Sequence, residues 1–321
     1  MQTKNRDFGK EDAIFKINMA PFANVIVGVS YIVTSLLFAF SNGLVGYVIL
    51  RHKEYHTDTY RIFGSMFIGC LMQLSSLCFG GVITATNGGL DFQSKKIAGA
   101  LLLSGWLVYM GSSLALAVDR TLTFISIFRE KTSRLVSLGF LTSSWFCAAG
   151  YFVCLLLPSA GITYFTDNSY GLWFYDDQPN TDILERMEMI LDFSILAIVM
   201  LLYVLVCARI AVMRKSARTE NSSSAIELRI LSIAIITFLY ESTCILGFFW
   251  GDKLFKDEKL LSIIMVATWI IDCGFFSIVT IVINTSIREK ILLLWPGKKS
   301  VTSVRVVVLS STMSDKSNAV A

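Results

Sequence analysis

The stretch from residue 97 to residue 120 reads IAGALLLSGWLVYMGSSLALAVDR. Residues 97–118 carry no charged side chain. At 1.5 Å per residue, a helix over this stretch is about 33 Å long, which matches a hydrocarbon core of about 30 Å. The stretch therefore predicts a membrane-spanning helix that ends at Asp119 and Arg120.

Six further apolar runs of similar length lie on both sides of this stretch. The seven predicted spans are about 22–50, 62–86, 97–119, 135–157, 190–213, 230–250 and 260–283. Hydrophobic residues make up 54% of the 321 residues and charged residues only 16%, whereas soluble domains are about 25% charged. We therefore expect an all-α membrane protein with one seven-transmembrane-helix domain over residues 22–286.

Shorter segments flank this predicted domain. Residues 1–21 are polar and charged, which leaves no apolar core for a cleaved signal peptide. After the last span, Ile287 and Ile291 fall on one helical face and the charges on another, so residues 287–296 predict a short helix in the membrane interface. Residues 297–321 would form a tail.

The distribution of lysine and arginine predicts the orientation in the membrane. With the N terminus outside, the three internal loops hold twelve Lys and Arg residues and the three external loops hold six. Cytoplasmic loops are enriched in these residues. We therefore expect a multi-pass protein of the plasma membrane with residues 1–21 outside and the C terminus inside.

Several classes of function are disfavoured. The net charge of +4 is mild and no basic run carries interleaved aromatics, so nucleic acid is not an expected partner. The seven cysteines lie in apolar stretches and the two histidines, His52 and His56, lie in the first internal loop. We expect no enzyme, no cofactor, no metal site and no disulfide.

Asp119 and Arg120 close the third span and allow two interpretations. In the first, a carboxylate holds Arg120 in one state of the bundle and releases it toward an entering partner in another. In the second, Arg120 only reaches for the lipid headgroups, as long cationic side chains do at helix ends. Spacing alone does not separate these interpretations.

A set of motifs in fixed order resembles nematode serpentine chemoreceptors of class T, the Srt family. The motifs are Tyr60-Arg61-Ile62-Phe63, Trp106, Ser112-Ser113 through Asp119-Arg120, Thr163-Tyr164-Phe165, Gly171-Leu172-Trp173-Phe174-Tyr175-Asp176, Trp269 and Asn284-Thr285-Ser286-Ile287-Arg288. The resemblance implies a rhodopsin-like bundle. It also implies a chemosensory G-protein-coupled receptor that binds an external small molecule and activates a heterotrimeric G protein, with sensory cilia as a candidate location.

The resemblance also implies roles for individual residues. The family's arginine after the third span corresponds to Arg120, which stands beside Asp119 and is expected to act in G-protein coupling, and its end of the seventh span corresponds to Asn284, Ile287 and Arg288. From their place in the basic third internal loop, we expect Arg214, Lys215 and Arg218 to form part of the docking surface; attraction to the membrane surface is the alternative for these three. This chain has Asp119 where the family commonly has asparagine. It also lacks the usual cysteine pair between the third span and the second external loop, which predicts a mobile outer loop.

The predicted ligand site lies between the helices. Fourteen residues at 100° each place Trp106 near the face of Arg120, with Tyr109 and Met110 one turn below. Glu241 and Asp272 fall near mid-membrane on the next two spans, and such acids normally face the bundle interior. Ligand binding by these five residues competes with a plainer role of the acids in joining two helices. An ion channel or transporter is the alternative function.

Overall fold

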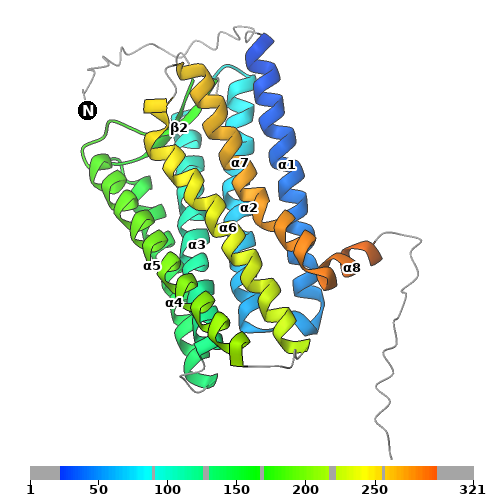
Figure 1. The fold of residues 1–321 in the computed structure, drawn as a ribbon. Coiled ribbons are helices and arrows are strands. Elements are labelled where there is room, and N and C mark those ends of the chain that lie inside the picture. The colour runs from blue at the N-terminus through cyan, green and yellow to red at the C-terminus, as the bar shows by residue number, and fades with distance from the viewer. Residues whose placement is uncertain are drawn as a thin grey trace, which may run out of the picture.

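The computed structural model describes residues 22–88, 91–125, 130–166, 170–216, 222–254 and 257–294. Seven long helices in this part of the chain lie side by side as one bundle (Figure 1). They are α1 (Phe22–Arg51), α2 (Asp58–Ala85), α3 (Phe92–Ile125), α4 (Glu130–Leu156), α5 (Thr181–Ser216), α6 (Ser222–Leu254) and α7 (Glu258–Ile283). Each is long and apolar enough to cross a membrane.

Shorter elements mark the two ends of the bundle. A 3₁₀ turn, η1 (Lys53–Tyr55), joins α1 to α2, and α8 (Thr285–Leu293) follows α7 and projects sideways, away from the bundle (Figure 1). At the opposite end, β1 (Ile162–Phe165) pairs antiparallel with β2 (Leu172–Tyr175). The bundle thus has a hairpin end and an α8 end.

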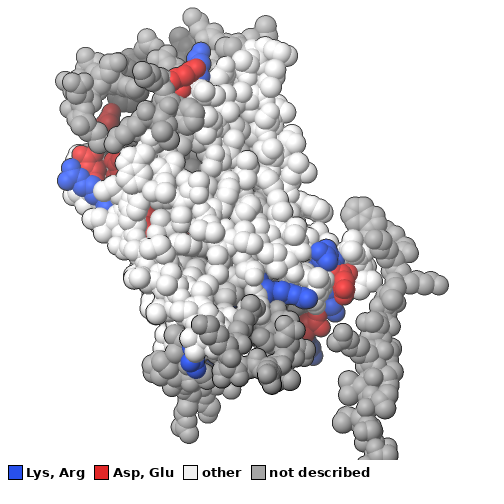
Figure 2. Space-filling view, in the orientation of Figure 1, with Lys and Arg blue, Asp and Glu red and all other residues white. Residues whose placement is uncertain are grey.

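The predicted fold class is confirmed, including the short eighth helix, although the helices extend past the predicted spans. The fifth span was expected from residue 190, whereas α5 begins at Thr181, and α3 continues past residue 119 to Ile125. Hydropathy detects only the apolar middle of a spanning helix, because the polar ends leave the hydrocarbon. Figure 2 agrees: on this face the charges gather toward the ends of the bundle.

Helix α3 is the centre of the bundle. In its most apolar stretch 78% of the residues are buried, against 17% in the corresponding stretches of α1 and α5. α1 and α5 therefore turn most of their apolar surface outward, as helices that contact lipid do. The buried face of α3 reaches from Trp106 near the hairpin end to Arg120 near the α8 end.

The hairpin packs against the bundle in its described residues, and the mobility of the outer loop stays a prediction. Tyr164 and Trp173 are buried, and their rings pack edge to face with centroids 4.9 Å apart. The Tyr164 hydroxyl lies 2.7 Å from Thr84 Oγ1 of α2, and Lys96 Nζ of α3 donates to Leu157 O at 2.5 Å. These contacts fasten the segment without a disulfide, because buried hydroxyl and ammonium groups must find partners.

The backbone of α3 approaches β1 so closely at Gly99 that no side chain fits between them. A Cβ at Gly99 would overlap the carbonyl and side chain of Ile162. At Gly46 of α1, by contrast, a Cβ would meet no atom within 4 Å.

Gly99→Ala should therefore loosen the hairpin and lower the stability by about 1–3 kcal/mol, the usual cost of overpacking. The matched control Gly46→Ala should be neutral or stabilising, since alanine is the better helix former. Thermal unfolding of the purified protein in lipid nanodiscs measures both. Equal unfolding midpoints for Gly99→Ala and the unmodified protein would show that the contact is not stabilising.

Candidate functional site

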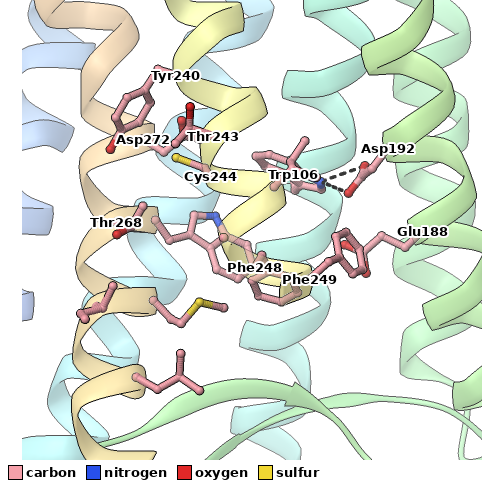
Figure 3. A pocket seen from close by; sticks show the side chains of 16 residues that line it. Trp106, Glu188, Asp192, Tyr240, Thr243, Cys244, Phe248, Phe249, Thr268 and Asp272 are labelled. Atoms are coloured by element: carbon pink, nitrogen blue, oxygen red, sulfur yellow. Dashed lines mark hydrogen bonds between the residues drawn. The ribbon is translucent and has the colours of Figure 1, made fainter. Parts of the chain in front are cut away.

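A cavity of about 260 Å³ lies between α3, α5, α6 and α7 toward the hairpin end. We call it the aromatic pocket, after the rings that line it (Figure 3). Its lining includes Trp106 of α3, Glu188 and Asp192 of α5, Tyr240, Cys244, Phe248 and Phe249 of α6, and Thr268, Trp269 and Asp272 of α7. Aromatic walls with a few polar groups are typical of small-molecule sites.

Two of the five residues predicted for a ligand site, Trp106 and Asp272, line this pocket. Tyr109 and Met110 do not; they are buried in the packed core of α3, where the Tyr109 ring meets Phe276 of α7 edge to face. Glu241 is also buried outside the lining and turns toward α3, where Ser113 Oγ donates to Glu241 Oε2 at 3.5 Å. A part for these three in ligand binding stays a prediction.

Two pocket acids on α5 were absent from the predicted site. Both carboxylate oxygens of Asp192 accept from Trp106 Nε1 at 3.1 Å, and Glu188 Oε2 accepts from the Tyr175 hydroxyl at 2.5 Å. Burial raises the pKa of Tyr175 well above its ordinary value, so its hydroxyl keeps the proton that it donates. The recurrence of acids at residues 185, 188 and 192 has the spacing of one helical face.

Asp272 differs from the two α5 acids in its hydrogen bonding. Its carboxyl is buried, and its Oδ1 accepts no hydrogen bond from the described residues. In Figure 3 it lies beside Tyr240 and Cys244, away from Asp192 and Glu188. Since no Lys, Arg or His lines the pocket in the part of the chain that the structure describes, the pocket is acidic without a balancing cation.

Trp106 and Trp269 connect the pocket wall to neighbouring helices. Trp269 Nε1 donates to Gln73 Oε1 of α2 at 2.8 Å, and its ring lies 6.3 Å from that of Trp106. Phe248 packs edge to face on Trp269 with centroids 5.7 Å apart. Each ring therefore contacts a side chain of another helix, and the three rings belong to three helices that line the same cavity.

A second cavity, of about 750 Å³, opens at the α8 end. Its wall contains Arg120, which is 2% exposed and forms an ion pair with Asp119. Thr59 of α2 joins the pair, because its hydroxyl donates to Asp119 Oδ2 at 2.8 Å and accepts from Arg120 at 2.5 Å. The structure thus has the arrangement in which a carboxylate holds Arg120, rather than one in which Arg120 reaches outward.

The predicted structural residues lie at the junction of α7 and α8. Asn284 Oδ1 accepts from the amide of Ile287 and so caps α8, and its Nδ2 donates to the Tyr60 hydroxyl of α2 at 3.2 Å. Ile287 is fully buried, and Arg288 donates to the carbonyl of Val282 at 3.0 Å. These contacts fix the start of α8 to α2 and α7.

The predicted docking residues of the third internal loop fall largely outside the description. The backbone of Arg214 and Lys215 belongs to the last turn of α5, whose side chains lie outside the described residues. Arg218 lies outside them altogether. Their role in coupling stays a prediction.

The chain matches a known protein family. The model of the serpentine-type seven-transmembrane chemoreceptors called Srt matches residues 15–303. Among solved structures, the crystal structure of squid rhodopsin superposes with a TM-score of 0.66 at 13% sequence identity, covering 87% of each chain, which shows the fold alone. No curated protein matches the chain by sequence.

The family match covers all seven helices and both cavities, and it confirms the resemblance on which the predicted fold and class of function rest. It makes the protein a multi-pass membrane protein and a receptor rather than an enzyme. The chain belongs to the Srt family of serpentine, seven-transmembrane, G-protein-coupled chemoreceptors.

Proposed function

We propose that this receptor binds an external small molecule in the aromatic pocket and activates a heterotrimeric G protein at its α8 end. The observation that carries the proposal is the position of two cavities on one helix. Trp106 lines the first cavity and Arg120 the second, and the fourteen residues between them correspond to about 21 Å along α3. One rigid element therefore has a side chain in each site.

The orientation is part of this proposal, with the hairpin end outside and the α8 end inside. Its support is the twofold excess of Lys and Arg in the loops on the α8 side. In this orientation the aromatic pocket lies in the outer half of the bundle and the Arg120 cavity faces the cytoplasm.

Epitope tags test the orientation directly. A tag before residue 22 should be labelled on intact cells, and a tag after residue 294 only after permeabilisation. The glycosylation sequons at Asn221 and Asn284 should carry no glycan, because both would face the cytoplasm. An N-terminal tag that is reached only in permeabilised cells would reverse the topology and favour the channel alternative.

The proposed mechanism is a shift between two packings of the bundle. A ligand favours one packing only through contacts that differ between the two. Asp272 lines the pocket and lies close enough to Glu241 to interact electrostatically, and Glu241 contacts Ser113 of α3. A ligand at Asp272 would therefore change the interactions that join α7, α6 and α3, and release of Arg120 from Asp119 would follow at the far end of α3.

Arg120→Ala should abolish G-protein activation and leave surface expression largely intact, because Asp119 keeps its hydrogen bond from Thr59. The matched control is Arg61→Ala. Arg61 is an exposed arginine of α2 that pairs with Asp58 at 3.2 Å, and such pairs contribute about 0–1 kcal/mol. A second-messenger reporter and cell-surface labelling give the two readouts. Full signalling by Arg120→Ala would exclude the proposed role.

The two buried acids should respond differently to neutral substitution. Asp272→Asn should weaken agonist potency roughly tenfold, the effect of losing one charge-assisted hydrogen bond, because Asp272 lines the pocket. Glu241→Gln should change potency less, since Glu241 acts only through Asp272. Dose–response curves and surface labelling with an agonist from a panel of cues provide the test. Unchanged potency with reduced expression would instead assign both acids to helix packing.

A further inference from the structure

We propose that the aromatic pocket recognises a small organic amine, whose ammonium group pairs with Asp272 and whose apolar body lies against Phe248 and Trp269. This inference rests on the proposed function and names the chemical class of its ligand. The observations behind it are a buried acceptor that has no hydrogen-bond partner, the charge of the pocket and the arrangement of its rings.

The acceptor is Asp272 Oδ1. The residue is 3% exposed and lines the pocket; its carboxyl has a hydrogen bond with the Cys244 side chain, and its Oδ1 accepts none from any residue that the structure describes. A buried polar atom without a partner costs free energy, and a carboxylate at membrane depth costs still more. A ligand cation is the group that removes this cost most completely, because it supplies both the hydrogen bond and the opposite charge.

The other two pocket acids, Asp192 and Glu188, already have hydrogen-bond donors, which leaves Asp272 as the acceptor for a cation. Asp192 already accepts from Trp106 with both oxygens, and Glu188 already accepts from Tyr175. They still lie across the pocket from Asp272, so their carboxyl groups disfavour an anionic ligand (Figure 3). The described lining has no basic side chain that could pair with a carboxylate or a phosphate.

The rings suit the rest of an amine. Phe248 and Trp269 meet at 81° with centroids 5.7 Å apart, which forms a corner of two aromatic walls, and Tyr240 lies beside Asp272. Aromatic faces attract ammonium groups and pack against apolar carbon. The cavity volume of about 260 Å³ is slightly below the usual range for drug-sized ligands, so the amine must be small.

The test compares amines with alcohols of the same shape. Full-length receptor in lipid nanodiscs is titrated with 2-phenylethylamine against 2-phenylethanol, and with isopentylamine against isopentanol, and the dissociation constants are measured by calorimetry. Each amine should bind at least about tenfold more tightly than its alcohol, as expected for a charge-assisted hydrogen bond. Asp272→Asn should reduce this ratio to roughly threefold or less, while its alcohol affinity stays near that of the unmodified receptor.

Asp91→Asn is the matched control. Asp91 undergoes the same chemical change but lies outside the pocket, exposed before α3, where it accepts from Ser94. It should keep the full preference for amines. An equal loss of preference in both variants would mean that surface potential attracts the cations, and it would overturn the proposal.

Two further outcomes also overturn the amine inference. If alcohols bind as tightly as amines, the pocket takes neutral ligands, and the proposed function survives without this ligand class. If no amine of either pair binds, the inference is wrong. G-protein activation is then judged on its own from the Arg120→Ala comparison, which needs no amine.

Discussion

A polar side chain in the middle of a membrane-spanning bundle has little access to water, so it must find a hydrogen-bond partner within the protein. This constraint follows from the absence of competing hydrogen-bond partners in hydrocarbon, and the interior of this receptor is arranged around it. Asn42 of α1 donates to the Cys273 carbonyl of α7 at 2.9 Å, Gln73 of α2 accepts from Trp269 of α7, and Trp106 of α3 donates to Asp192 of α5. Each pair fixes two helices in register.

The same constraint applies to buried polar atoms that have no hydrogen-bond partner. Within the described residues, one oxygen of Asp272 and one of Glu241 accept no hydrogen bond. Both lie where α6 and α7 face the bundle interior, next to the aromatic pocket or just beyond it. A packed core has few such groups, and in the proposed function the oxygen of Asp272 is the one that a ligand in the pocket would satisfy.

The sequence predicted what hydropathy and charge can report. Seven spans, their order and the amphipathic segment around Ile287 follow from composition and from the spacing of apolar residues. The hairpin did not follow, because its strands of four residues are too short for a periodic signal and depend on buried partners such as Thr84.

The candidate site was predicted only in part, and the reason is geometric. Depth and helical phase pointed to Trp106 and Asp272, which both line one cavity. They could not place Glu241, because its direction depends on the rotation of α6 against α3. Glu188 lies before the predicted span, which began at about residue 190. It belongs to the first turns of α5, which begins at Thr181, and these turns are too polar to be recognised as part of a span.

The helices around the pocket differ in how closely they pack against one another. At the crossing of α2 and α3, a Cβ on Gly69 would lie 2.9 Å from the carbonyl oxygen of Gly105, so these backbones touch. α6 has few contacts with α5, and a Cβ at Gly247 of α6 would meet no atom within 4 Å. Tightly packed interfaces resist small displacements. In the proposed mechanism, a ligand between Asp272 and Phe248 acts where α7 meets α6, and it can displace α6 more easily than α2 or α3, because α6 packs loosely on α5.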